Sequence, residues 1–151
     1  MENSEASTQP RQIDLLLARY EESHRHPMNE KIHWICVPVI VWTVFALIWV
    51  VHPILAGVSA ILALTYYFSL SLAFAFGMSL MMSAMLLVTI AIPDPWLLPV
   101  AVAVFVLAWI GQFIGHKIEG KKPSFFDDLR YLLIGPLFVL RFLYRRLKIA
   151  Y

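Results

Sequence analysis

The chain has 151 residues, of which 60% are hydrophobic and only 15% are charged, and its formal net charge is +2. A soluble domain usually carries about 25% charged residues, and the small net charge gives no indication of nucleic-acid binding. The single cysteine, Cys36, excludes an intramolecular disulfide and, within one chain, a metal site built from several cysteines.

The N-terminal part is polar up to Lys31 and lacks the apolar region and cleavage site of a signal peptide, so we expect the first span to stay as an anchor. Residues 1–9 are polar without periodicity, which predicts a disordered tail. From residue 10 onward, apolar side chains recur at the spacing of one helix face: Ile13, Leu16, Leu17 and Tyr20. This pattern predicts an amphipathic helix on the membrane surface or against the bundle. Pro27 should interrupt that helix and begin the next one.

Two long uncharged stretches follow. No Asp, Glu, Lys or Arg occurs from Ile32 to Pro93, and a second uncharged stretch runs from Pro95 to Gly115. A bilayer core about 30 Å thick takes roughly 20 apolar helical residues per crossing, so the stretches accommodate three spans and one span. With turns at His52-Pro53, near 69–72 and at 93–95, we place the spans at about residues 32–51, 54–70, 72–92 and 96–115.

The C-terminal part is expected to add helices without a fifth span. Ser124, with Asp127 three residues later, resembles a capping box that opens a helix. The uncharged run from Tyr131 to Leu140 is about half a membrane thickness, and Gly135-Pro136 interrupts it. We therefore expect interfacial or re-entrant helices over residues 124–148.

The basic residues predict the orientation. All twelve Lys and Arg residues precede the first span or follow the fourth, and the connecting loops have none. The positive-inside rule places both tails in the cytoplasm, which requires an even number of spans. The sequence thus predicts an all-α, polytopic membrane protein: a single membrane domain over residues 10–151 with a four-transmembrane-helix bundle. Its membrane would be the bacterial inner membrane, or the endoplasmic reticulum in a eukaryote.

This topology brings the start of the first span and the end of the fourth to one membrane face. Polar residues gather at both places: His24, His26, Asn29 and His33 at the first, and Gln112, His116 and Glu119 at the second. Asn29 and His33 share one helix face, and Gln112, His116 and Glu119 share another. Imidazoles with a carboxylate suit iron, zinc or manganese, and the two amides could hold the ligands in place.

Each of these residues alone is more often structural, and His26 is expected to cap the helix begun by Pro27. The shared cluster favours a function, because polar groups facing a bundle interior are costly. His52 lies at the opposite face and is interpreted as a loop residue. Two other functions stay open: a bundle that transports protons or solutes, and a structural protein without chemistry. The lack of an ionisable residue in the middle of the spans counts against transport.

Two segments resemble the signatures of a known family. The first is His24-Arg-His-Pro-Met-Asn29-Glu-Lys-Ile-His33 with Val37-Pro38. The second is Trp109-Ile-Gly-Gln112-Phe-Ile-Gly-His116, followed by Glu119, Lys122-Pro123 and Gly135-Pro136-Leu137-Phe138. Both resemble the 2-hydroxy fatty acid dioxygenases, which are fungal endoplasmic-reticulum enzymes of phytosphingosine breakdown and their bacterial relatives. The resemblance extends from about Leu15 to Phe142.

The resemblance implies iron(II)-dependent α-oxidation, in which O2 is used to shorten a long-chain 2-hydroxy fatty acid by one carbon. It implies His24, His33 and His116 as iron ligands, with Glu119 also in the catalytic set and Asn29 and Gln112 beside them. Glu119 and His26 are further candidate ligands.

The chain departs from the family pattern at Ser124, where alanine is expected, and at Arg141, where an acidic residue is often found. The acyl chain could lie in the bilayer or in a groove between spans. Basic residues near the site could attract the substrate carboxylate: Lys117, Lys121, Lys122 and Arg130.

Overall fold

The computed structural model describes residues 10–151, and over these residues it is helical, without strands. The predicted disordered tail, residues 1–9, lies outside the described residues. A short 3₁₀ helix, η1 (Ser124–Phe126), lies between the last two of six α helices. These are α1 (Gln12–Glu21), α2 (Pro27–Val51), α3 (Pro53–Leu70), α4 (Leu72–Ala91), α5 (Asp94–Glu119) and α6 (Tyr131–Leu147).

Four helices, α2 to α5, are long and apolar enough to cross a membrane, and they are the four that the sequence predicted. The outer two extend beyond the predicted spans: α2 begins at Pro27, in the first turn where proline is tolerated, and α5 continues to Glu119. Hydropathy marks only the apolar length of a helix, whereas backbone hydrogen bonding continues into its polar ends. The polar ends of α2 and α5 carry the residues of the candidate site.

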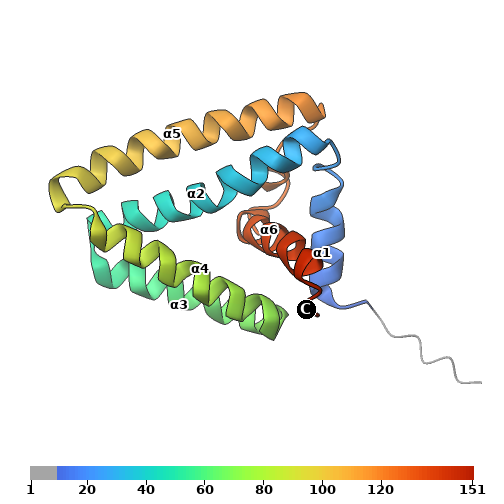
Figure 1. Ribbon diagram of the computed structural model, residues 1–151, viewed down its shortest axis with the longest axis horizontal. Helices are drawn as coiled ribbons and strands as arrows, with labels where there is room; N and C mark the ends of the chain where they lie inside the picture. Colours follow the sequence, from blue (N-terminus) through green and yellow to red (C-terminus); the bar gives the residue numbers. More distant parts are fainter. Residues whose placement is uncertain (1–9) are drawn as a thin grey trace, which may run out of the picture.

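The four long helices form two antiparallel pairs that diverge from one end of the molecule (Figure 1). The pair α2 and α5 and the pair α3 and α4 meet at the turns after Val51 and Ala91. At the open end, α6 lies between the pairs with α1 beside it. The termini of the described chain and the histidine-bearing ends of α2 and α5 are all at this open end.

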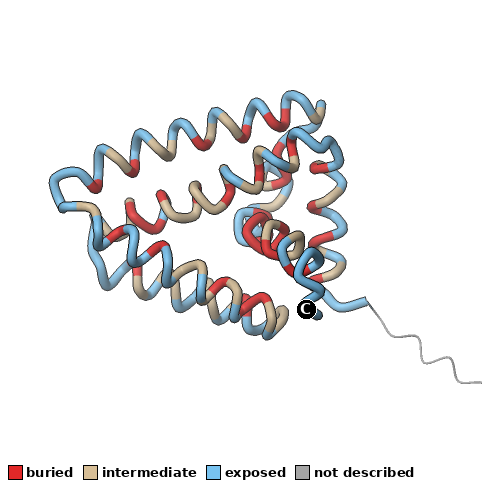
Figure 2. Tube along the Cα trace, in the orientation of Figure 1, coloured by how far each residue is buried: buried red, intermediate tan, exposed pale blue. Residues whose placement is uncertain are grey.

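A hydrophobic core fills the open end. Fully buried side chains come from three helices: Ile13 and Leu17 of α1, Phe74 and Met78 of α4, and Ile134 and Leu137 of α6. Two hydroxyls tie the second pair to α6, since Tyr67 donates to the Leu133 carbonyl at 3.0 Å and Tyr144 to the Ala73 carbonyl at 2.7 Å. Thus α1 packs against the bundle, while α3 and α4 leave long apolar faces exposed (Figure 2), which suits helices that could span a membrane.

Two glycines let α5 approach α2 closely. A Cβ atom at Gly111 would lie 2.8 Å from the Cys36 sulfur, and one at Gly115 would collide with the Asn29 side-chain oxygen. Their spacing is the small-xxx-small pattern that allows close contact between membrane helices. The glycines therefore set the separation of the two helices that carry His33 and His116.

Two local predictions for the C-terminal part are wrong. The Ser124 side chain caps no helix; the Asp127 amide instead bonds the Ser124 carbonyl at 3.1 Å, which closes only the 3₁₀ turn, and α6 begins later, at Tyr131. Gly135-Pro136 does not interrupt α6. Pro136 lies near the start of α6, and its missing N–H costs one backbone hydrogen bond. Gly135 leaves room for the Tyr20 side chain, because a Cβ atom at position 135 would lie 3.0 Å from the Tyr20 hydroxyl.

Candidate metal centre

Three histidines from three separate segments meet at the open end of the bundle. His24 lies in the loop after α1, His33 in the first part of α2 and His116 in the last turn of α5. Their side chains are buried, with 3%, 1% and 5% of their surface exposed. One nitrogen of each ring lies within 4.8 Å of the corresponding nitrogens of the other two. The structure thus brings together the three residues that the topology and the resemblance singled out.

Main-chain carbonyls fix which nitrogen of two rings carries the proton. The Nδ1 atom of His24 lies 2.7 Å from the Tyr20 carbonyl, and that of His33 lies 2.9 Å from the Asn29 carbonyl. A carbonyl can only accept, so each Nδ1–H donates and each Nε2 keeps a free lone pair. The His33 lone pair faces His116, whose Nε2 atom lies 3.1 Å away, and a neutral imidazole with such a lone pair is the form that binds metals.

The arrangement fits a metal ion better than it fits a closed hydrogen-bond network. The Nε2 atoms of His33 and His116 are 3.1 Å apart, while Nε2 of His24 is buried without a partner among the described residues. A buried unpaired polar atom costs about 1–3 kcal/mol. A cation bound by the three nitrogens would satisfy it, and an all-imidazole set suits zinc, copper, iron or nickel.

Burial keeps His24 in the neutral form. It lowers the pKa of His24 to about 4, although the hydrogen bond to the Tyr20 carbonyl opposes this shift. The His24 ring also stacks on the Tyr20 ring, with centroids 4.1 Å apart and an interplanar angle of 9°. At neutral pH the ring is therefore uncharged and held in one orientation, as a metal ligand must be.

Glu119 lies beside the histidine group but not among its nitrogens. Its carboxylate accepts hydrogen bonds from the backbone amides of Arg25 at 3.1 Å and His26 at 2.8 Å, and from the Asn29 amide at 3.2 Å. The end of α5 is thereby joined to the loop that carries His24 and to the start of α2. Glu119 is therefore not among the three side chains whose ligand atoms converge, and its hydrogen bonds hold the segments that carry His24 and His33.

The remaining polar candidates are placed as follows. His26 is exposed and caps α2, as predicted, because its Nδ1 accepts from the Met28 amide at 3.2 Å. Asn29 is buried and also donates to the Ser23 carbonyl at 3.2 Å. Gln112 is buried one turn before His116. His52 is at the far end of the bundle, where it caps α3 by accepting from the Ile54 amide.

A mostly apolar pocket adjoins His33 and His116. Its walls come from α2, α5, η1 and the start of α6, and include Val37, Ile40, Val41, Trp109, Phe125 and Leu132. Sequence reasoning missed the wall formed by η1 and α6, and it also missed Tyr20 as the partner of His24. The only signal for that wall was the resemblance of the segments around Pro123 and Pro136.

A second, more polar pocket lies on the His24 side of the group. Charged side chains of both signs line it: Glu21, Arg25, Glu30, Arg141 and Arg145. The histidine group is therefore reached from two cavities of different character.

Comparison with known proteins identifies a family. The family described as 2-hydroxy-palmitic acid dioxygenase Mpo1-like matches residues 11–147, which include every residue of the histidine group and both pockets. No curated protein and no solved structure matches the chain significantly.

Proposed function

The chain belongs to the Mpo1-like family of 2-hydroxy-palmitic acid dioxygenases, and we propose that it converts long-chain 2-hydroxy fatty acids to the fatty acid one carbon shorter, using iron(II) and O2. The observation that carries this proposal is the buried group of three histidines beside an apolar pocket. A neutral, three-imidazole set with neighbouring space is suited to a metal ion that must also admit substrate.

The proposed reaction balances without an external reductant. The bond between C1 and C2 of the 2-hydroxy acid breaks, C2 becomes the carboxyl carbon of the shorter acid, and C1 leaves as carbon dioxide. The products are the shorter acid, carbon dioxide and one molecule of water, and together they contain the three oxygen atoms of the substrate and the two of O2. All the electrons that O2 accepts come from the two carbon atoms whose bond is broken.

His24, His33 and His116 would hold the iron. Bound iron(II) would supply O2 activation and a chelation site for the carboxylate and 2-hydroxyl oxygens of the substrate. The carbonyls of Tyr20 and Asn29 keep two of the rings in the ligating form. Glu119 and Asn29 also fix the loop that carries His24 and join it to the end of α5, so the protein holds its ligands before substrate arrives.

The apolar pocket would take the acyl chain next to the histidines. Val37, Ile40 and Leu132 offer aliphatic contact there, and each methylene removed from water contributes about 0.8 kcal/mol. The pocket belongs to a chain whose four long helices are suited to a membrane, and a long-chain acid concentrates in a membrane. With all basic residues in the tails, we infer that both termini and the histidine group are on the cytoplasmic side.

The test is the reaction of isotopically labelled 2-hydroxypalmitate with the purified, iron-loaded protein, with and without O2. We expect the acid one carbon shorter only when O2 is present. Palmitate should not react, because a site that uses a substrate hydroxyl strongly rejects the analogue that lacks it. Product formed without O2, or no product of any chain length from protein that holds iron, would contradict the proposal.

A further inference from the structure

The three histidines line two cavities of different character. His33 and His116 line the apolar pocket, whereas His24 lines the polar one. A 2-hydroxy fatty acid has the same division, with a long alkyl chain on one side of its reacting carbon and a carboxylate on the other. The two cavities therefore offer separate places for the two ends of such a molecule.

We propose that Arg141 binds the substrate carboxylate in the polar pocket while the acyl chain occupies the apolar pocket across the histidine group. This inference rests on the proposed function and adds the orientation of the substrate and a residue that recognises its charge. A carboxylate has two oxygens, so it can bind at the histidine group and accept a hydrogen bond from a guanidinium at the same time.

The charges of the polar pocket favour an anion. Three arginines, Arg25, Arg141 and Arg145, line it against two glutamates, Glu21 and Glu30. Phe138 and Phe142 form the rest of its wall beside His24. The positive excess is small, so the position of each arginine decides which one can act.

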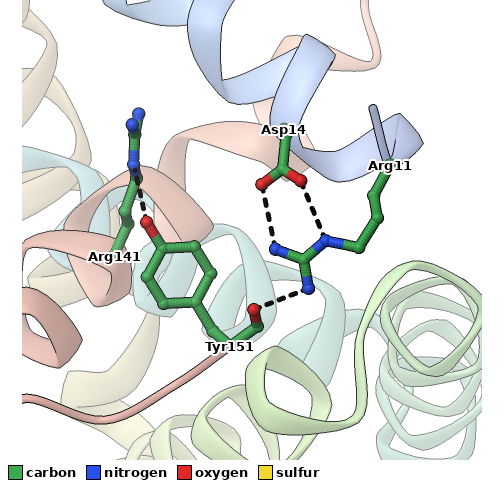
Figure 3. Close-up of polar contacts among 4 residues, drawn as sticks. All are labelled: Arg11, Asp14, Arg141 and Tyr151. Atoms are coloured by element: carbon green, nitrogen blue, oxygen red, sulfur yellow. Dashed lines mark hydrogen bonds and ion pairs between the residues drawn. The ribbon is translucent and has the colours of Figure 1, made fainter. Parts of the chain in front are cut away.

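Arg141 is the arginine that the structure holds in place. Its side chain is only 15% exposed, and its Nη1 donates to the Glu21 carboxylate at 2.9 Å. Its Nε donates to the Tyr151 hydroxyl at 3.1 Å, and the Tyr151 carbonyl is bound in turn by Arg11, which pairs with Asp14 (Figure 3). A guanidinium anchored in this way loses little freedom when it binds an anion, and partial burial strengthens the attraction.

The basic residues that the sequence suggested for this task lie elsewhere. Lys117, Lys121, Lys122 and Arg130 line neither of the two pockets. Lys121 donates to the Glu22 carbonyl at 2.7 Å, and Arg130 pairs with Asp128 at 2.6 Å. Arg141, the arginine of the polar pocket that neighbouring side chains hold in place, comes from α6, at the position where the chain departs from the family pattern.

The experiment compares binding of 2-hydroxypalmitate with that of its neutral amide, 2-hydroxypalmitamide, to the full-length, iron-loaded protein without O2. The wild-type protein should prefer the acid. A hydrogen bond to a charged group is worth about 1.5–3 kcal/mol, so Arg141→Gln should lose about 10- to 100-fold in affinity for the acid and little for the amide. With O2 present, the same variant should raise KM more than it lowers kcat.

Glu21→Gln is the matched control for structure. It keeps the guanidinium but removes the charge of the Glu21 carboxylate, which pairs with Arg141 and competes with the substrate, so acid binding should improve. Lys122→Gln removes one exposed positive charge away from both pockets and should keep the preference for the acid.

Two results would overturn the role of Arg141 alone: equal binding of acid and amide by the wild-type protein, or the same loss in Glu21→Gln as in Arg141→Gln. Wild-type protein that binds neither molecule would contradict the proposed function as well.

Discussion

The Nε2 atoms of His33 and His116 lie 3.1 Å apart, although 83 positions separate the two residues in the chain. Neither helix could create this relationship alone, because the two rings meet only when α2 and α5 run antiparallel at close range. The candidate metal centre is therefore a product of helix packing, and metal binding should be lost when the packing of α2 against α5 is disturbed.

Replacing any one of the three histidines with alanine should remove bound iron and abolish turnover. Each ring supplies one of the three nitrogens that converge among the described residues, so its loss leaves an incomplete ligand set. His52→Ala is the comparison, because His52 is exposed at the far end and should cost only the cap of α3, about 1 kcal/mol of stability. Metal analysis of each purified variant checks this. Equal iron loss at His52 and His116 would indicate general misfolding in place of ligation.

Glu119→Gln should weaken metal binding without changing the ligands. The amide cannot keep all three hydrogen bonds that the carboxylate accepts from Arg25, His26 and Asn29, so the loop carrying His24 should loosen. Such changes beside a metal site typically cost about 10- to 100-fold in affinity, and Asn29→Ala should act similarly. Cobalt substituted at the site gives a visible spectrum that checks the ligands. A spectrum altered in Glu119→Gln would identify Glu119 as a ligand after all.

The sequence predicted the spans because uncharged length and the position of basic residues are one-dimensional patterns. It predicted the histidine group because those patterns determine a topology that brings the start of the first span and the end of the fourth to one face, and because two segments resemble a known family. It failed where three-dimensional contact decides. The local pattern at Ser124 resembles a cap, but the next helix begins only at Tyr131. Gly111 and Gly115 have a spacing typical of close helix packing, but a prediction from hydropathy does not use this spacing. The role proposed for Arg141 depends on the position of α6 between the two helix pairs (Figure 1), which no local pattern predicts.

Reporter fusions should place both termini in the cytoplasm and an insertion at Asp94 on the opposite side. All twelve Lys and Arg residues lie in the tails, and the four long helices return the chain to the side where it started. Fusion of an enzyme active only in one compartment, at each terminus and after Asp94, measures this directly. Termini found on opposite sides would contradict a membrane arrangement in which His33 and His116 share one face.

The metal-free protein should lose stability as the pH falls from about 6.5 to about 4. Unfolded, His24 takes up a proton near its ordinary pKa of about 6.5, whereas in the folded protein burial lowers the pKa to about 4. Between these values the unfolded state binds more protons, so stability decreases with acidification, and above 6.5 this residue contributes no slope. Thermal unfolding in detergent at a series of pH values measures it. His24→Gln should show a shallower decline, and parallel curves for both proteins would contradict the assignment to His24.

Gly115→Ala should disrupt the metal centre from a position that contacts no metal. The added Cβ would collide with the Asn29 side chain, so α2 and α5 must separate or Asn29 must leave its contacts with Glu119 and Ser23. Either response moves His33 relative to His116, and we expect reduced iron content together with a lower Tm. Gly57→Ala in α3 is the matched control, because a Cβ there meets nothing within 4 Å. Alanine is favoured over glycine inside a helix by roughly 0.5–1 kcal/mol, so Gly57→Ala should keep its iron and melt at the same or a higher temperature. Full iron loading in Gly115→Ala would show that close packing of the two helices is not what assembles the three histidines.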